Sequence, residues 1–276
     1  MYGSFQPAIL MPPNHNGQGL HDGHVSLAAL ARDECELVIA SVFVNPKQFS
    51  VNDTDGGVDK YPRTLEADLA LLEAQGVDYV FAPDTAEMYP ERQGKRVQIH
   101  AVGYDKTPEG LCRPEFFDGV GTIVAKLFNI VNPSHAYFGQ KDAMQCVLIQ
   151  QLVEDLNYNI EIRIGETKRE ANGLARSTRN QYLTPEEKES AAVIHRALSQ
   201  AQTHLAQSSG AVPATKIQAI VRAILLSEPR ITEIQYISVA SKPEMDELDT
   251  ISADRGGIIS VAVMFGDKRS IDNIVI

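Results

Sequence analysis

The 276-residue sequence contains no tryptophan, only three cysteines, and no apolar stretch long enough to span a membrane. Its cysteines (Cys35, Cys112 and Cys146) are odd in number and lack the spacing of a metal site, which is typical of buried or incidental thiols in a reducing compartment. The N-terminus also lacks the basic segment and long apolar run of a secretory signal peptide. These absences favour a cytoplasmic protein without a membrane partner.

Positive charge is scarce as well, since 25 lysines and arginines stand against 36 aspartates and glutamates, for a net charge of −11. A protein that binds a nucleic-acid duplex needs a basic face, and no cluster of basic residues of that kind occurs here. The composition therefore favours a protein that handles small molecules and has no nucleic-acid partner. A local basic pocket could still hold phosphates.

Short apolar runs recur along residues 7–170 in the manner of buried strands. Pro7–Met11 is a short run, whereas Glu36–Val44 is almost continuously apolar and rich in β-branched residues, which suits a parallel strand covered on both faces. Further strands are expected at 77–83, 135–139 and 159–170.

Helix-like segments lie between these runs, at 23–34, 64–76, 119–131 and 143–156. In the second of them the spacing places Leu65, Leu69 and Leu72 on one face, and Gly76 is a typical C-terminal stop. Strands that alternate with helices at this rhythm predict an α/β fold with a Rossmann-like, doubly wound parallel sheet.

The pattern changes after about residue 170. Thr184, Pro185 and Glu187 form a capping box with proline at the first helical position. The remaining segments are two helix-like stretches, 184–207 and 214–228, and three strand-like runs, 231–241, 258–265 and 270–276. We expect a smaller C-terminal α+β domain, and we divide the chain into 1–168 and 169–276. The polar stretch Ser50–Lys60 predicts a mobile loop.

Two histidines flank a glycine where the first long helix begins, in the sequence His21-Asp22-Gly23-His24. Doubly wound folds bind ligands at such strand-to-helix turns, and a helix N-terminus offers free N–H groups to an anion. Gly23 allows close approach of the backbone, and both imidazoles can donate to phosphate oxygens. Two surface histidines in a polar loop are an equally good explanation of these four residues alone.

Polar side chains also follow two later strands. Asn45 and Gln48 come after the second strand, where their amides could bind a carboxylate or hydroxyls, although Asn-Pro is also a common turn dipeptide. Lys141 stands between the expected strand at 135–139 and the following helix, with Gln145 one turn further along the same helix face. Lys141 could hold a polyphosphate or simply be solvated.

The fourth polar segment, Arg176 to Arg179, lies at the expected domain junction and includes Ser177 and Thr178. Hydroxyls beside a guanidinium suit a triphosphate, although a polar interdomain loop would look similar. Three of the four segments fall at strand ends on one edge of the sheet, and the fourth falls where a second domain would cover that edge. This convergence favours one shared site.

The segments GLHDGHVSL, SVFVNPKQF, RPEFFDGVGTIVAKLFNIVNPSHAYFGQKDAMQ and GLARSTRNQYLT resemble the pantoate–β-alanine ligase family, a member of the nucleotidyltransferase superfamily. The likeness extends from about Gly19 to the C-terminus and keeps the order and spacing of the motifs. The HxGH sequence is similar to the HIGH motif of class I aminoacyl-tRNA synthetases, and Ser177–Arg179 falls where their KMSKS-type loop would lie.

The resemblance implies an ATP-dependent ligase that first forms an enzyme-bound pantoyl adenylate and pyrophosphate, and then transfers the pantoyl group to β-alanine with release of AMP. It also implies that residues 1–168 bind nucleotide and pantoate, that residues 169–276 cover the active site, and that the protein is a homodimer. By the same likeness, four residues are catalytic: His21, His24, Lys141 and Arg179. ATP contacts would come from these four together with Gly139, Asp142, Ser177 and Thr178. Pantoate contacts would come from Asn45, Gln48, Tyr61 and Gln145, and Asp68 would lie near bound Mg²⁺.

The sequence departs from the family pattern at several positions. Gly17 replaces a usual methionine, Glu115 and Phe116 replace a usual Gly-His pair, and Arg176 stands where an apolar residue is common. Glu115 adds a negative charge that could oppose ATP. These departures leave a catalytically weakened nucleotide-binding homologue as the alternative function. A tRNA-charging relative is a third hypothesis, and the net negative charge argues against it.

Overall fold

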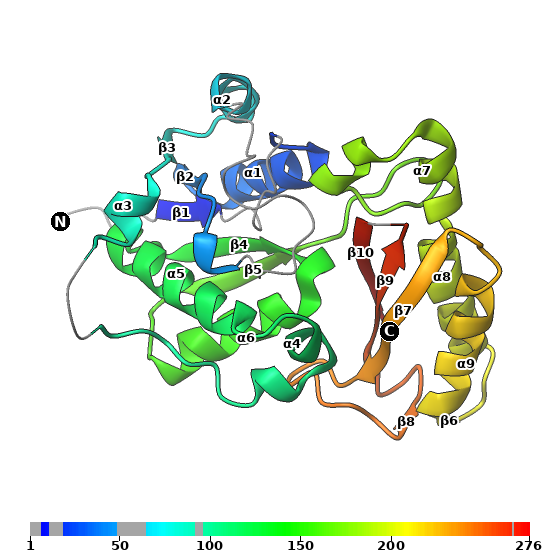
Figure 1. Cartoon of the computed structure of the whole chain (residues 1–276). Coiled ribbons are helices and arrows are strands. Elements are labelled where there is room, and N and C mark those ends of the chain that lie inside the picture. The colour runs from blue at the N-terminus through cyan, green and yellow to red at the C-terminus, as the bar shows by residue number, and fades with distance from the viewer. Residues whose placement is uncertain (1–6, 11–18, 49–64, 92–95, 267) are drawn as a thin grey trace.

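The computed structural model describes residues 7–10, 19–48, 65–91, 96–266 and 268–276. Gly17, Tyr61 and the expected loop Ser50–Lys60 lie outside these residues. The first part of the chain contains a five-stranded parallel sheet in the order β3-β2-β1-β4-β5 (Figure 1). Its strands are β1 (Pro7–Leu10), β2 (Leu37–Ser41), β3 (Tyr79–Phe81), β4 (His135–Gly139) and β5 (Glu161–Gly165).

Helices cover both faces of this sheet (Figure 1). Those on one face are α1 (Asp22–Glu34) and α2 (Leu65–Ala74), and those on the other are α5 (Phe116–Val131) and α6 (Ala143–Asp155). Because successive strand residues point to opposite faces, Ala8 and Tyr137 pack with Leu27 of α1, whereas Ile9 and Phe138 pack with α5 and α6. The expected doubly wound parallel sheet is therefore confirmed.

The strand order reverses between β1 and β4, and this reversal fixes where a ligand site can form. The chain leaves β1 toward α1 on one face and leaves β4 toward α6 on the other. A crevice opens between two such diverging connections at the carboxyl ends of the strands.

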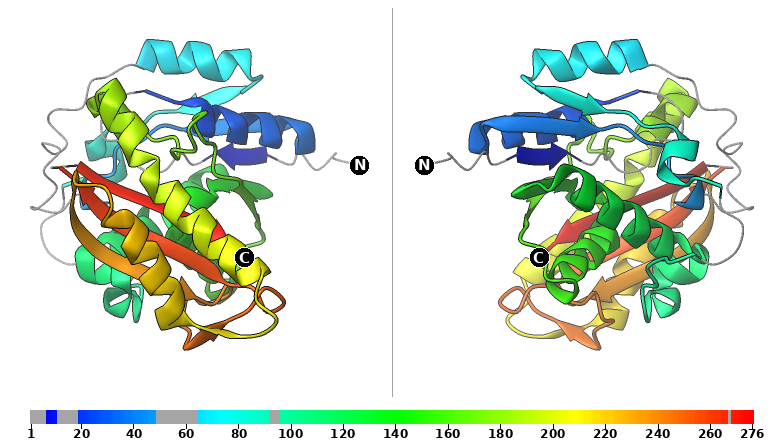
Figure 2. Two further views of the ribbon diagram at one scale, coloured as in Figure 1. Left: turned by 90° about the vertical axis from the view of Figure 1, so that its right-hand side faces the viewer. Right: turned by 90° about the vertical axis from the view of Figure 1, so that its left-hand side faces the viewer.

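The C-terminal part of the chain forms a three-stranded antiparallel sheet in the order β10-β9-β7. Its strands are β7 (Ile231–Ala240), β9 (Ile258–Phe265) and β10 (Lys268–Val275), and β6 (Val212–Pro213) pairs with β8 (Thr250–Ile251). The helices α8 (Val193–Ala206) and α9 (Ala214–Leu225) lie against this sheet (Figure 2). The expected smaller α+β domain is confirmed as a fold, with a hydrophobic core of its own.

The capping box at Thr184 is present, but the helix that it begins ends early. Helix α7 (Pro185–Ala191) is followed by α8, and Ala192 at the junction donates its N–H to the carbonyl of Ser190. The carbonyl of Lys188, which a continuous helix would use for this bond, instead accepts a hydrogen bond of 3.1 Å from Nδ2 of Asn172. A side chain from a distant loop thus interrupts the helix.

Short elements without strong periodicity were not expected from the sequence. They include the helices α3 (Thr85–Met88) and α4 (Pro108–Cys112), and 3₁₀ turns at Pro46–Gln48, Tyr104–Lys106, Gln140–Asp142 and Thr178–Tyr182. Strands β2 and β5 are also shorter than expected, since they end at Ser41 and at Gly165. Several of these turns carry residues of the candidate site.

Helix α2 does not bury the face that its leucine spacing predicts. Leu72 is 2% exposed, but Leu65 and Leu69 are each 40% exposed. Asp68, on the same helix, is 6% exposed, and its Oδ1 accepts a hydrogen bond of 2.6 Å from the backbone N–H of Leu20. This hydrogen bond accounts for the burial of Asp68, which lies on the same side of the helix as Leu72.

Glu115, which replaces a usual glycine, precedes helix α5 in a left-handed backbone conformation with φ 61° and ψ −1°. Glycine adopts this region without the steric cost of a Cβ, roughly 1–2 kcal/mol, but loses about 0.5–1 kcal/mol more chain entropy on folding. We therefore expect Glu115→Gly to raise the free energy of unfolding by up to about 1 kcal/mol. Chemical denaturation would measure the change. The control Gln150→Gly, at an exposed position in the interior of α6, should instead destabilise by about 1 kcal/mol, and destabilisation by both variants would contradict the strain at Glu115.

Candidate active site

The two histidines of the HxGH sequence cap helix α1 reciprocally. Nδ1 of His21 accepts a hydrogen bond of 3.0 Å from the N–H of Gly23, and Nδ1 of His24 accepts one of 3.2 Å from the N–H of His21. The two rings stack with their centroids 3.6 Å apart. Because both Nδ1 atoms act as acceptors, each neutral ring carries its proton on Nε2, which is then its hydrogen-bond donor.

Gly23 is required by one of these rings. A Cβ at this position would lie 2.7 Å from Cε1 of His21 and 2.9 Å from its Nδ1. The sequence suggested that the backbone at Gly23 makes a close approach, and the group that it approaches is the His21 imidazole. Any larger residue at this position would push the ring out of its cap.

The environment of His21 keeps its ring neutral. Burial, together with the positive charges of Lys141 and Arg176, lowers its pKa to about 4 from an ordinary value of 6.5. A histidine whose pKa is depressed in the folded state disfavours folding as the pH falls, because the unfolded chain takes up the proton first. His21 therefore removes stability between about pH 6.5 and pH 4, and at neutral pH it is an uncharged hydrogen-bond donor.

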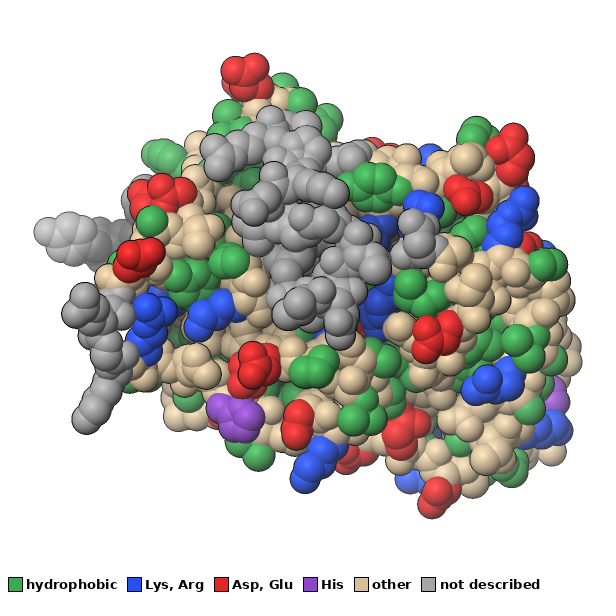
Figure 3. All heavy atoms as spheres, in the orientation of Figure 1, with side chains coloured by type: hydrophobic (Ala, Val, Ile, Leu, Met, Phe, Trp, Pro, Cys, Tyr) green, Lys and Arg blue, Asp and Glu red, His purple; other side chains and the backbone are tan. Residues whose placement is uncertain are grey.

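A cleft of about 640 Å³, open solvent included, lies in front of these histidines. It is lined by His21, Gly23, His24, Leu27, Gly139, Lys141, Asp142, Glu166, Thr167, Lys168, Arg176, Ser177, Thr178 and Arg179. All eight residues that the resemblance assigns to ATP belong to this lining. Four lining residues are basic and two are acidic, so the cleft is locally positive in a chain of net charge −11. Basic side chains also appear on the surface between α1 and β10 (Figure 3).

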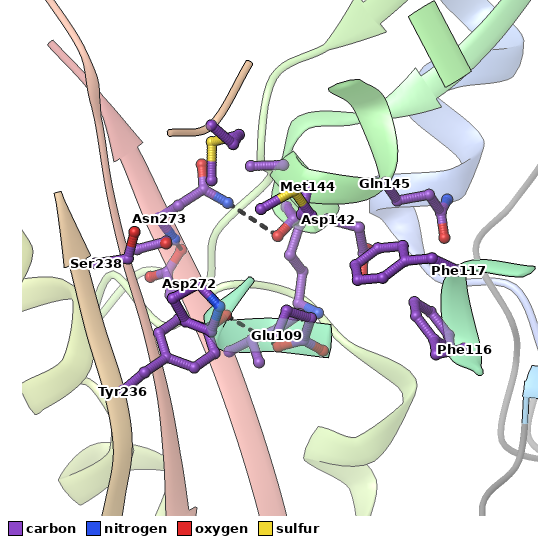
Figure 4. Close-up of a pocket in the computed structure, with 16 residues that line it drawn as sticks. Glu109, Phe116, Phe117, Asp142, Met144, Gln145, Tyr236, Ser238, Asp272 and Asn273 are labelled. Atoms are coloured by element: carbon purple, nitrogen blue, oxygen red, sulfur yellow. Dashed lines mark hydrogen bonds between the residues drawn. The ribbon is translucent and has the colours of Figure 1, made fainter. Parts of the chain in front are cut away.

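Lys141 lies in the 3₁₀ turn Gln140–Asp142 between β4 and α6 rather than on the helix itself, so Gln145 does not share a helix face with it as expected. The turn is held by β10, because Nδ2 of Asn273 donates to the carbonyls of Gln140 and Lys141 at 2.9 Å each. Figure 4 shows Asn273 beside this turn. Lys141 lines this cleft and two neighbouring cavities. Within the described part of the chain its ammonium has no hydrogen-bond or ion-pair partner, so it is available to a ligand.

The hydroxyl-rich segment opposite the histidines begins a 3₁₀ turn. Ser177 caps this turn, and its Oγ accepts a hydrogen bond of 3.3 Å from the N–H of Arg179. Asn180 is buried and donates to the carbonyl of Ala175 at 3.0 Å and to Oε1 of Glu170 at 3.2 Å. These bonds fix Ser177, Thr178 and Arg179 on the far wall of the cleft.

The residues expected to bind pantoate come from several segments, and Tyr61 lies outside the described residues. Gln145 lines a second pocket of about 480 Å³, where Phe116 and Phe117 lie on its side and Tyr236 lies across from it on β7 (Figure 4). Asn45 is 1% exposed and already bonded, since its Nδ2 donates to the carbonyl of Gly119 at 3.0 Å and its Oδ1 accepts from the hydroxyl of Tyr89 at 2.8 Å.

Gln48 is also buried, in the turn at Pro46–Gln48 that packs against α5, and it is not among the residues that line either pocket. Glu115 and Phe116 likewise do not line the nucleotide-sized cleft, and the Glu115 side chain is exposed. The negative charge of Glu115 is therefore not part of the lining that faces the histidines.

Asp68, the residue expected near Mg²⁺, is buried, and its Oδ1 accepts the N–H of Leu20. Among the residues that the structure describes, no cluster of three or more histidine, cysteine, aspartate or glutamate side chains could hold a metal ion. This hydrogen bond anchors the segment that leads into His21, which gives Asp68 a structural connection to the site.

A buried charged cluster, which was not expected from the sequence, lies at the far side of the second pocket. Glu109 of α4 accepts two hydrogen bonds from Arg269 of β10, at 3.0 and 2.6 Å, and one of 3.0 Å from the hydroxyl of Tyr236. Burial opposes ionisation of Glu109, but the Arg269 guanidinium outweighs it and holds the pKa of the carboxyl below its usual range. Arg113 lies 3.9 Å from Glu109 and donates to the backbone carbonyl of Gln48 at 2.9 Å.

Glu166, Thr167 and Lys168 line the cleft directly after β5 and were not identified from the sequence either. Their position at the carboxyl end of β5, a parallel strand at the edge of the sheet, was the available signal, because the rule that identified the other segments applies to this strand as well. In the described residues, no helix has both the length and the apolar character needed to cross a membrane.

The chain matches the family model for pantoate-beta-alanine ligase over residues 17–275. It is 47% identical to the pantothenate synthetase of Chloroflexus aurantiacus over 254 residues, which cover 92% of this chain and 87% of that protein. It is also 43% identical to the pantothenate synthetase of Carboxydothermus hydrogenoformans over 260 residues, which cover 93% and 88% of the two chains.

Solved structures show the same likeness in three dimensions. The pantothenate synthetase of Thermus thermophilus is similar with a TM-score of 0.85 and 38% sequence identity, over 98% of this chain and 92% of that chain. The pantoate-beta-alanine ligase of Francisella tularensis, solved in complex with beta-gamma ATP and beta-alanine, is similar with a TM-score of 0.75 and 29% identity, over 100% of this chain and 91% of that chain.

Proposed function

This chain belongs to the pantoate–β-alanine ligase family, and on that premise we propose that it condenses pantoate with β-alanine at the expense of ATP. In the first step an oxygen of the pantoate carboxylate attacks the α-phosphorus of ATP, and the bond to pyrophosphate breaks. In the second step the amine of β-alanine attacks the acyl carbon of the enzyme-bound pantoyl adenylate. The bond to AMP breaks, a proton leaves the nitrogen, and pantothenate and AMP are released.

The observation that carries the proposal is that two imidazoles, an ammonium and a guanidinium from separate segments line one cleft. Displacement at phosphorus requires positioning and charge stabilisation more than it requires a protein nucleophile. We propose that His21 and His24 donate from Nε2 to phosphate oxygens, and that Lys141 and Arg179 stabilise the charge that grows on the departing pyrophosphate. Ser177, Thr178, Gly139 and Asp142 would complete the ATP contacts.

Pantoate is proposed to bind beside Lys141 through the amide of Gln145, with Asn45, Gln48 and Tyr61 as further contacts. Gln145 is supported most directly, because it lines a pocket that shares Lys141 with the cleft. The buried hydrogen bonds of Asn45 support an additional role in shaping the turn at Pro46–Gln48. Mg²⁺ is proposed to arrive with the triphosphate, whose charge it partly neutralises, and Asp68 is proposed to lie near it.

Exchange of radiolabelled pyrophosphate into ATP tests the first step. We expect exchange when ATP, Mg²⁺ and pantoate are all present and none when pantoate is omitted. Binding of ATP without pantoate-dependent exchange would instead support the weakened nucleotide-binding homologue. Tight binding of tRNA would support the tRNA-charging relative.

We also propose that the protein is a cytoplasmic homodimer, in which residues 169–276 form the domain that covers the active site. The dimer rests on the family resemblance. Sedimentation equilibrium is expected to give twice the mass of one chain at micromolar concentration, and the mass of a single chain would contradict the proposal.

A further inference from the structure

Arg176 connects the hydroxyl-rich wall of the cleft to the helix that carries the histidines. Its Nη1 lies 2.6 Å from Oδ2 of Asp22, the first residue of α1, which is flanked directly by His21 and Gly23. The two partners are 154 residues apart in the sequence, and Arg176 also lines the cleft itself. The ion pair therefore joins two walls that the fold brings together from distant segments.

The backbone around Arg176 is held in a hairpin. Its N–H donates to the carbonyl of Lys168 at 2.8 Å, and Arg169 and Ala175 form an antiparallel bridge. Ser177, which follows Arg176 directly, caps the turn that contains Arg179. A side-chain contact at Arg176 is thus transmitted to the hydroxyl and guanidinium groups of this wall through a short stretch of backbone.

The charge of Arg176 also acts on His21. Four residues with ionisable side chains surround His21. Lys141 belongs to the turn between β4 and α6, Arg176 belongs to the hairpin, and Asp22 and His24 belong to α1, the helix that His21 caps. Glu166 and Lys168 line the same cleft from the end of β5. Burial and the two cations favour the neutral ring, and Asp22 favours the protonated one.

The ion pair is too exposed to matter much for folding. The side chains of Arg176 and Asp22 are 37% and 71% exposed, and pairs of this kind contribute little to stability. Its effect must therefore be sought in the geometry and charge of the cleft.

We propose that Arg176 is a positioning residue that latches the Ser177–Arg179 wall to the N-terminus of α1 and so sets the width of the triphosphate site. This Arg176–Asp22 latch rests on the proposed function, because it serves the ATP site of that reaction. It assigns a role to the arginine that stands where the family commonly has an apolar residue.

A double-mutant cycle on the full chain tests the latch. Arg176→Met and Asp22→Asn are each expected to raise the Kd for ATP, measured by calorimetry, and the KM for ATP in pyrophosphate exchange by about tenfold, with a smaller change in kcat. The double variant should raise the Kd and the KM for ATP no further than Arg176→Met does, because each single change already breaks the contact. Arg230→Met, which removes another exposed arginine that pairs with Glu228, is the matched control and should change neither quantity.

Titration of the histidine resonances by NMR gives a readout that a purely structural defect would not produce. Loss of the cation in Arg176→Met should raise the pKa of His21 above its wild-type value of about 4, and loss of the anion in Asp22→Asn should lower it. A weaker ATP affinity in Arg176→Met with no change in Asp22→Asn would overturn the latch and make Arg176 a direct phosphate ligand. Wild-type affinity in both variants would also overturn it. Failure of exchange in the wild type would contradict the proposed function alone, since ATP affinity and the His21 titration do not depend on turnover.

Discussion

Replacing Lys141 with methionine is expected to slow pantoate-dependent pyrophosphate exchange by about 10²–10³-fold, the loss typical of removing one preorganised charge-stabilising group. The ammonium of Lys141 has no hydrogen-bond or ion-pair partner in the described part of the chain, and it lies where the cleft meets two further cavities. Methionine keeps most of the length of the side chain and removes only its charge and donors. The change should therefore act on the chemistry far more than on the fold.

Two measurements make this prediction specific. The thermal unfolding temperature of Lys141→Met should stay close to that of the wild type, because the substitution removes no hydrogen bond or ion pair of the described structure. Lys216→Met, at an exposed position on α9, is the control and should retain full exchange activity. Exchange in Lys141→Met within about threefold of the wild type would refute the assignment of Lys141 to the phosphates.

Replacing Glu109 with alanine is expected to lower the free energy of unfolding by about 3–5 kcal/mol, the cost of removing one partner from a buried ion pair. The substitution would leave Arg269 buried without its bidentate partner and would remove the acceptor of the Tyr236 hydroxyl. Because Glu109 belongs to α4 and its two partners belong to β10 and β7, the loss should weaken the packing of α4 against the C-terminal sheet. Urea denaturation would measure it.

The pH dependence of this effect has a definite sign. A carboxyl whose pKa is depressed in the folded state stabilises the fold above its unfolded pKa, and this contribution is lost as the pH falls through the folded value. The difference between wild type and Glu109→Ala should thus be constant above about pH 5 and should shrink below about pH 4. Glu233→Ala, at an exposed position on β7, should change stability by less than about 0.5 kcal/mol. Equal effects of the two substitutions at neutral pH would show that the cluster is not the cause.

Local pattern was enough to predict the architecture of the first sheet. Its strands are short apolar runs separated by helical periodicity, and that alternation is consistent with few topologies other than a parallel, doubly wound sheet. The same locality explains why the capping box at Thr184 could be recognised, since all of its contacts lie within one helical turn. Convergence of the strand-end segments could also be predicted, because the carboxyl ends of parallel strands share one edge.

The orientation of individual polar side chains could not be predicted in this way. The sequence around Asn45 is consistent with a ligand-binding amide or a turn residue, and it does not identify Gly119 and Tyr89 as its hydrogen-bond partners. The spacing in α2 identifies the face that carries its leucines, but it does not identify the backbone N–H of Leu20 as the partner of Asp68. In both cases the partner lies far away in the chain, 44 residues or more, and no local pattern identifies it.

The sequence by itself determined the class of fold, the family, and the segments that meet at the cleft, because these depend on periodicity and on contiguous motifs. Only the tertiary structure decided that Arg269 would neutralise Glu109 across 160 residues and that Arg176 would pair with Asp22. The physical reason is that a charge selects its partner by distance and burial, and both are set only once the chain has folded.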